Sequence, residues 1–330
     1  MEKYAVRQVD DDSVWDRFVN ESPQGTLFST THYLCAMGRE FERFYVCKGN
    51  EIKAAVALVL SDDRTAVELD DLVVYNGIMF APQADQKPVK ARQERFELSE
   101  FVIGHLCNRC SRVEMALAPQ FEDARPFLWH NYHSSDPNHK FITDLRYTSY
   151  LAIGELSQGN TNEEETEIFK NMETPRRYNV REARKAGAYV RPGCDAGKFI
   201  RFYRELMRGQ GEQVAEAKLA RMRNLIDTLA GSGDVVIYEV CRSSGDVLYV
   251  VVYGLDMKRS YYLFGAGDGL ATEGYKGTFA HWEAFRDLAV QRRITEVDME
   301  GVNSPKRGWF KLGFGGDLRP YYQIYKGTPT

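Results

Sequence analysis

The chain has 330 residues, of which 43% are apolar and 27% are charged, with a mean hydropathy of −0.45. This composition indicates a globular protein, and no run approaches the ~20 apolar residues that a membrane-spanning helix needs. Because the chain has 43 basic and 47 acidic side chains, the charge of the surface as a whole does not favour nucleic acid, and we expect no DNA partner.

The chain is longer than a domain with a single hydrophobic core usually is, so we expect two domains, residues 1–145 and 146–330. The first residues have neither the apolar core nor the cleavage site of a signal peptide. Six cysteines without a secretion signal indicate reduced thiols. We therefore expect a cytoplasmic protein without a transmembrane segment.

Residues 1–145 are predicted to mix strands and helices. The predicted strands are 4–9, 44–48, 52–60, 73–80 and 113–117, and the predicted helices are 12–20, 30–37 and 97–110. A polar, proline-containing loop is expected at 84–91.

A similar order follows in the rest of the chain. It comprises a strand at 142–153, a polar linker at 157–167, helices at 199–207 and 219–229, an antiparallel meander of 235–240, 248–255 and 260–264, a helix at 278–292 and a strand at 294–299. The predicted fold class is therefore α/β of the mixed α+β kind, built from two related halves with a cleft between them.

Two motifs suggest a metal site and a dinucleotide-binding loop, but their surroundings in the sequence favour other interpretations. Cys107 and Cys110 have zinc-like spacing, but both fall on the predicted helix 97–110 and the downstream histidines miss the finger pattern, so no metal site is expected. Gly265-Ala266-Gly267-Asp268-Gly269 closes an antiparallel meander, whereas a dinucleotide-binding loop opens a helix after a parallel strand.

Gly274-Tyr275-Lys276-Gly277-Thr278 directly precedes the predicted helix 278–292. Backbone amides at a helix N-terminus suit a phosphate or an acyl oxygen, so Tyr275, Gly277 and Thr278 are candidate substrate-binding residues. The alternative is an ordinary helix cap at Thr278. Trp282, on the inward face of the same helix, completes this candidate set.

A dense basic helix is predicted at 175–186. Its basic side chains are Arg176, Arg177, Arg181, Arg184 and Lys185. Basic clusters are usually solvated faces. The functional alternative is contact with an anionic substrate, a diphosphate or an RNA backbone, with Arg177 as a candidate substrate-binding residue.

Asp298, Glu300 and Lys311 are the candidate catalytic residues. A carboxylate at the end of a buried strand can have its pKa raised by desolvation, which would let it accept an ammonium proton near neutral pH. A nearby lysine can stabilise the oxyanion of an acyl-transfer intermediate. The alternative is that these segments are ordinary loops and that Lys311 merely lies over its aromatic neighbours. One of these neighbours, Phe310, is a candidate substrate-binding residue.

With these residues the chain resembles the Fem family of aminoacyl and peptidyl transferases, within the wider GNAT acetyltransferase superfamily. The resemblance covers nearly the whole chain. Its most specific part is the ordered series Gly277-Thr278, Val297-Asp298-Met299-Glu300-Gly301, Phe310-Lys311-Leu312-Gly313-Phe314-Gly315-Gly316 and Pro320-Tyr321-Tyr322. Earlier segments are Gly25-Thr26-Leu27-Phe28-Ser29, Asp123-Ala124-Arg125-Pro126-Phe127-Leu128-Trp129 and the basic run 176–187.

The resemblance implies two tandem GNAT-like domains, each a mixed, mostly antiparallel sheet flanked by helices, with the acceptor on the first and the donor and catalytic motifs on the second. An acyl group would pass to an amine from aminoacyl-tRNA or acyl-CoA, with no tightly bound cofactor. By matching position, Lys311 would be the family's lysine near the reacting groups. Members that act on peptidoglycan precursors hold the acceptor diphosphate with basic residues from both domains, whereas residues 28–37 here contain no lysine or arginine.

The leading hypothesis is thus an aminoacyl- or acyltransferase acting on an amine of a cell-envelope sugar or peptide precursor, such as one of peptidoglycan. The acceptor would be a small molecule or a nucleotide- or lipid-linked one, with tRNA as the partner when it is the donor. Two alternatives stay open. One is an acyl-CoA-dependent GNAT N-acetyltransferase acting on an aminosugar or another small amine, and the other is a non-catalytic binding protein on the same scaffold.

Overall fold

The computed structural model describes residues 3–83, 86–158 and 162–327. The chain forms two compact units, one of Met1–Arg146 with Pro320–Thr330 and one of Tyr147–Arg319. It passes between them within β7 (Ile142–Ala152) and again within β13 (Asp317–Lys326). The C-terminal segment, expected in the second domain, thus belongs to the first unit by its contacts. Residues 84–85 and 159–161, in the expected loop 84–91 and linker 157–167, lie outside the described residues.

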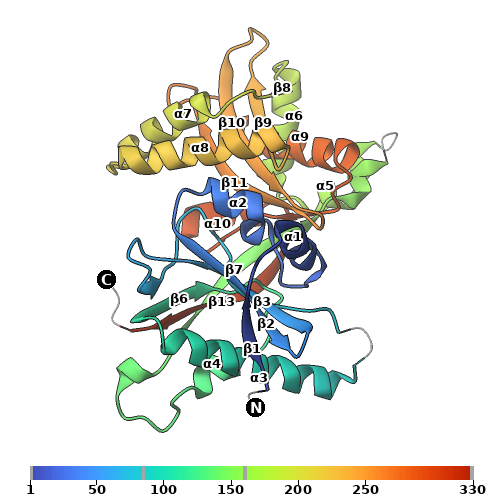
Figure 1. Cartoon of the computed structure of the whole chain (residues 1–330). Coiled ribbons are helices and arrows are strands. Elements are labelled where there is room, and N and C mark those ends of the chain that lie inside the picture. The colour runs from blue at the N-terminus through green and yellow to red at the C-terminus, as the bar shows by residue number, and fades with distance from the viewer. Residues whose placement is uncertain (1–2, 84–85, 159–161, 328–330) are drawn as a thin grey trace. The chain divides into compact units, whose positions relative to one another are not determined.

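The first unit, called unit 1, consists of sheets with flanking helices (Figure 1). Its elements before β7 are β1 (Ala5–Gln8), α1 (Asp12–Glu21), η1 (Leu27–Ser29), α2 (Thr31–Ala36), β2 (Phe41–Lys48), β3 (Glu51–Val59), β4 (Ala66–Val67), β5 (Gly77–Phe80), α3 (Pro88–Cys107), β6 (Arg112–Ala116), α4 (Arg125–Trp129) and η2 (Pro137–His139). One sheet has the order β1-β2-β3-β5 and is antiparallel. In the other, β6 pairs parallel to β4 and antiparallel to β13.

The helix α3 differs from its prediction. It begins at Pro88 rather than at residue 97 and ends at Cys107, so Cys110 lies beyond it and the two cysteines do not share the helix. Its first turns are mostly exposed and polar, and they therefore carry none of the apolar periodicity that marks a helix in sequence. Proline is well suited to the first turn, where no backbone donor is needed.

The second unit, called unit 2, contains the predicted antiparallel meander. Its elements between β7 and β13 are η3 (Gly154–Ser157), η4 (Glu163–Glu165), α5 (Glu167–Asn171), α6 (Thr174–Lys185), β8 (Tyr189–Pro192), α7 (Gly197–Gly209), α8 (Glu216–Ser232), β9 (Val235–Cys241), β10 (Val247–Leu255), β11 (Ser260–Gly267), α9 (Lys276–Gln291), β12 (Glu296–Asp298) and α10 (Pro305–Leu312). The strands β8 to β11 pair antiparallel in chain order, and α9 leads from β11 to the parallel strand β12. A parallel pair needs such a crossover connection.

The core of unit 2 lies between this sheet and α9. The helix contacts β9, β10 and β11, while α7 and α8 also contact the meander (Figure 1). Buried aromatic and aliphatic side chains of α9 supply much of this core, including Trp282, Phe285 and Leu288. Among the described residues, no helix combines the length and apolar character needed to cross a membrane.

Candidate active site

The candidate site of unit 2 lies where two parallel strands separate. β11 and β12 pair at only two positions, Ser260 with Val297 and Tyr261 with Asp298. β11 then continues to Gly267, whereas β12 ends at Asp298. The residues that follow β12 include Glu300, whose φ of 54° lies in the left-handed region that non-glycine residues rarely adopt. The chain then enters α10, which carries Lys311.

Asp298 anchors the turn after β12. Its side chain is fully buried, and its carboxylate accepts hydrogen bonds from the hydroxyl of Thr148 and, at 2.7 Å, from the backbone N–H of Glu300. A buried carboxylate with such donors is held in one orientation. Asp298 therefore fixes the unusual backbone of Glu300.

Glu300 is a buried acid with one oxygen uncommitted. It is 8% exposed, and among the described residues its Oε1 atom has no hydrogen-bond partner. Burial raises the pKa of Glu300 well above 4.5, and the negative charge of Asp298 raises it further, while the nearby Lys311 opposes the shift. Glu300 is thus able to hold a proton at a pH where an exposed glutamate is ionised.

Lys311 approaches Glu300 from α10. Its Nζ atom donates a hydrogen bond of 3.3 Å to the carbonyl of Gly301 and lies 4.9 Å from the ring centroid of Tyr262. Burial lowers the pKa of Lys311 below 10.5, although Glu300 and Asp298 pull it upward. The structure therefore brings all three predicted catalytic residues together, with a cation beside a carboxyl group in largely apolar surroundings.

Aromatic rings and one arginine pack beside this pair. Phe310 lies 5.5 Å from His281 and 5.6 Å from Phe314, measured between ring centroids. The guanidinium of Arg176 lies 4.3 Å from the centroid of Phe310, and burial lowers the pKa of Arg176. Phe310, predicted from its position next to Lys311, is thus part of an aromatic cluster that holds a cation over its face.

His281 is a buried residue of this cluster that the sequence did not single out. It is fully buried in α9, its Nδ1 atom is hydrogen-bonded to the hydroxyl of Tyr253, and its Nε2 atom has no partner among the described residues. Burial lowers the pKa of His281 to about 3, with smaller contributions from the charges of Lys311 and Arg176. The imidazole is therefore neutral at physiological pH. A histidine on an otherwise apolar helix face was the available signal.

The predicted turn before α9 has a different geometry. α9 begins at Lys276, and Tyr275 stands at the cap position without a side-chain hydrogen bond, so the interpretation of Thr278 as the cap is wrong. Thr278 is 1% exposed, and its hydroxyl accepts hydrogen bonds from Arg176 at 3.4 Å and Asn179 at 3.3 Å. Gly277 faces the cluster, since a Cβ there would lie 3.6 Å from Phe310.

Two further candidates make local contacts. Trp282 is fully buried, donates a hydrogen bond to Glu163 and packs 5.1 Å from Phe169, so it belongs to the core. Arg177 donates to Thr174 on its own helix at 3.1 Å.

The rest of the basic helix is largely ion-paired. These pairs are Arg181 with Glu164, Arg184 with Glu163 and Glu283, and Lys185 with Glu182. Such pairing is typical of a solvated face.

The fold matches solved structures, although no protein-family model and no curated protein matches the sequence. FemX is similar with a TM-score of 0.64 at 14% identity, over 96% of each chain. A conserved protein of unknown function from Bacteroides thetaiotaomicron gives 0.61 at 9% identity, over 98% of this chain and 99% of that one. A tandem GNAT protein from the clavulanic acid biosynthesis pathway gives 0.54 at 10% identity, over 99% of each chain.

The protein therefore has a tandem GNAT-like fold, and the fold class expected from the sequence is confirmed. Within that class its fold is similar to that of FemX over nearly all of both chains. At these identities the likeness concerns the fold.

Proposed function

We propose that this protein is an acyltransferase that moves an aminoacyl or acyl group from an activated donor to an amine. The observation that carries the proposal is the pairing of the buried Glu300 with the half-buried Lys311 where β11 and β12 separate. The pair offers a proton acceptor and a cation in surroundings of low polarity, where charges act strongly. The Fem-like tandem GNAT fold supports the same class of reaction.

The proposed reaction needs one proton acceptor and one oxyanion stabiliser. Glu300, as the carboxylate, takes a proton from the acceptor ammonium, and the neutral amine attacks the donor carbonyl carbon. Lys311, as the ammonium, stabilises the oxyanion of the tetrahedral intermediate. The intermediate then expels the leaving group, which is a ribose alkoxide for aminoacyl-tRNA or a thiolate for acyl-CoA, and this group receives a proton from Glu300. The attacking nitrogen loses its remaining extra proton to solvent.

Asp298 and Glu300 have different roles in this proposal. Asp298 is held by Thr148 and by the backbone of Glu300, so it serves as a positioning residue. Glu300 has a buried oxygen without a hydrogen-bond partner in the described part of the chain, so it is assigned as the proton acceptor. Phe310 and Gly277 face each other beside the pair and would contact the donor.

The resemblance of the sequence to the Fem family supports an acceptor amine on a cell-envelope sugar or peptide precursor, with aminoacyl-tRNA as the donor and a cytoplasmic site of action. The fold, which is similar to that of FemX, is consistent with it. A second candidate is an acyl-CoA-dependent N-acetyltransferase of small amines. The likeness to the tandem GNAT protein, a structure described as being without AcCoA, supports that alternative.

The test is a donor panel on the purified protein. Radiolabelled aminoacyl-tRNAs and acetyl-CoA are each supplied with amine acceptors, and a thermal shift is recorded for each donor, because a ligand of the folded state raises its stability. Transfer that is lost after ribonuclease treatment assigns the tRNA donor, and transfer that resists ribonuclease with stabilisation by CoA assigns the acyl-CoA donor. A panel that shows no stabilisation and no donor turnover would favour a non-catalytic binding protein.

A further inference from the structure

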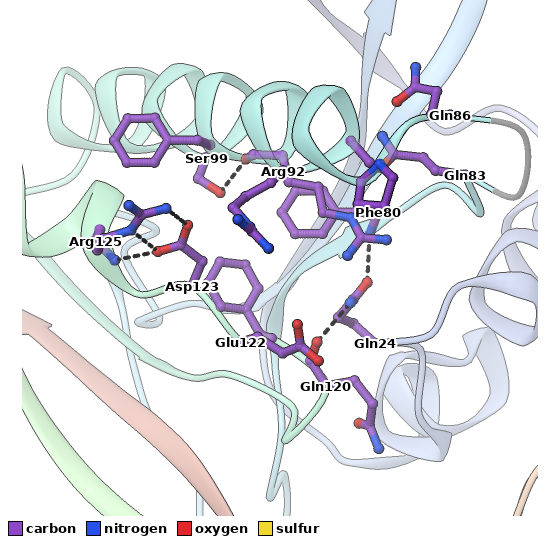
Figure 2. A pocket seen from close by; sticks show the side chains of 15 residues that line it. Gln24, Phe80, Gln83, Gln86, Arg92, Ser99, Gln120, Glu122, Asp123 and Arg125 are labelled. Carbon is purple, nitrogen blue, oxygen red and sulfur yellow. Dashed lines mark hydrogen bonds and ion pairs between the residues drawn. The ribbon is translucent and has the colours of Figure 1, made fainter.

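A cavity of about 570 Å³ lies within unit 1, a size typical of small-molecule sites. It is lined by residues of α3 and β5, the segment 120–125, and Gln24 (Figure 2). It shares no residue with the group around Lys311, which belongs to unit 2. A role for this cavity therefore goes beyond the proposed acyl transfer.

The walls of the cavity are held together by hydrogen bonds. Gln24 is 3% exposed, accepts a bond of 3.1 Å from the backbone N–H of Phe80 and donates one of 2.9 Å to the carbonyl of Gln120 (Figure 2). Asp123 accepts bonds of 2.7 and 2.6 Å from Arg125, and this contact lowers the pKa of Asp123. The cavity is thus preformed, and the charge of Asp123 is balanced within its wall.

Two other arginines of the lining form no ion pair in the described part of the chain, although the charge of Arg92 helps to lower the pKa of Asp123. Across the described residues, neither Arg92 nor Arg95 has a carboxylate within ion-pairing distance. The Nε atom of Arg95 is buried without a hydrogen-bond partner, and its guanidinium lies 5.7 Å from the ring centroid of Phe80. A guanidinium offers planar, paired donors that match a carboxylate or a phosphate. Among the described residues of the lining, the carboxylate without an ion pair is Glu122, which is exposed, as is Arg92.

Three aromatic rings give the otherwise polar lining an apolar surface. Phe80, Phe96 and Phe121 line the cavity together with Pro88. Gln83 donates through its amide nitrogen to Glu94 at 3.0 Å, while its Oε1 atom is buried without a partner in the described structure. One acceptor is therefore left for an N–H or O–H group of a ligand.

We propose that this cavity binds a small organic oxyanion, a carboxylate or phosphate ester joined to a flat apolar body, with Arg92 and Arg95 holding the oxyanion. The aromatic walls cover the body. The excess of unpaired positive charge sets the preference for an anion over the corresponding neutral molecule.

The test uses isothermal titration calorimetry at low salt with phenyl phosphate, benzoate and phenol as probes. We expect saturable binding of at least one anion at one site per chain, with phenol at least tenfold weaker. Arg92→Gln and Arg95→Gln should each weaken that binding about tenfold, because each removes a charged hydrogen-bond donor. Lys90→Gln is the matched control, since Lys90 is an exposed cation on the same helix outside the lining.

The two anions distinguish a carboxylate ligand from a phosphate ligand by which one binds more tightly. Absence of saturable binding by either anion would overturn the proposal, as would equal losses in Lys90→Gln and Arg92→Gln. Thermal melts show whether Arg95→Gln, whose side chain packs on Phe80, remains folded. If it does not, the comparison of Arg92→Gln with Lys90→Gln decides.

Discussion

The carboxylate of Asp298 accepts a hydrogen bond of 2.7 Å from the backbone N–H of Glu300. Glu300 has a φ of 54°, and a non-glycine residue held there costs on the order of 1 kcal/mol or more. The bond to Asp298 helps to offset this cost and fixes the position of the Glu300 backbone. Two acids that are equivalent in sequence thus differ in structure, one anchoring the turn and the other retaining an unpartnered oxygen within the described residues.

Lys311→Ala is expected to lower kcat by about 10²- to 10³-fold, because it removes the cation assigned to the oxyanion. Lys306→Ala is the control, since Lys306 is an exposed cation of the same helix. Circular dichroism should show that both variants are folded. An unchanged rate in Lys311→Ala would remove Lys311 from the mechanism.

Glu300→Gln and Asp298→Asn are expected to fail in different ways. Glu300→Gln should lower kcat by about 10²-fold or more with little change in stability, because a neutral amide is accepted at a buried site while proton transfer is lost. Asp298→Asn should lower the free energy of unfolding by roughly 1–3 kcal/mol, because charged hydrogen bonds to Thr148 and Glu300 are weakened. Urea unfolding and steady-state rates measure both effects, and the opposite division would reverse the two roles.

The rate of transfer should depend on pH through the pair. The reaction needs Glu300 unprotonated and Lys311 protonated, and burial raises the pKa of Glu300 above 4.5 and lowers that of Lys311 below 10.5. We therefore expect kcat to fall below an acidic midpoint higher than 4.5 and above an alkaline midpoint lower than 10.5. Lys311→Arg should move the alkaline midpoint upward, since a guanidinium stays charged. A flat profile between these limits would contradict the assignment.

His281 should make stability depend on pH. Its pKa is about 3 in the folded protein and 6.5 in the reference state, so the folded state binds fewer protons between these values. The contribution of His281 is present above pH 6.5 and is lost as the pH falls toward 3, by at most about 5 kcal/mol. His281→Asn, which keeps a hydrogen-bonding group near Tyr253, should flatten this dependence in denaturant titrations. The exposed His133→Asn should leave it unchanged, and an equally steep slope in His281→Asn would contradict the account.

Sequence patterns anticipated the strands and helices whose apolar residues recur at regular spacing, such as the meander and α9. They did not anticipate α10 or β13, although α10 carries Lys311. α10 is a short helix with a single fully buried position, Gly308, and β13 is mostly exposed or half-buried along its length. Such elements leave weak periodicity because tertiary contacts rather than one apolar face hold them.

The amino-acid sequence by itself determined the mixed α/β class and the group of Asp298, Glu300 and Lys311, because these depend on local periodicity and on residue type. Only the tertiary structure decided which acid is the anchor and which is available, that His281 is neutral, and that Thr278 is a buried acceptor rather than a helix cap. It also brought α3, β5 and the segment 120–125 together around a cavity. These properties depend on burial and on partners distant in sequence, since desolvation sets a pKa and a neighbour's donors set a side chain's role.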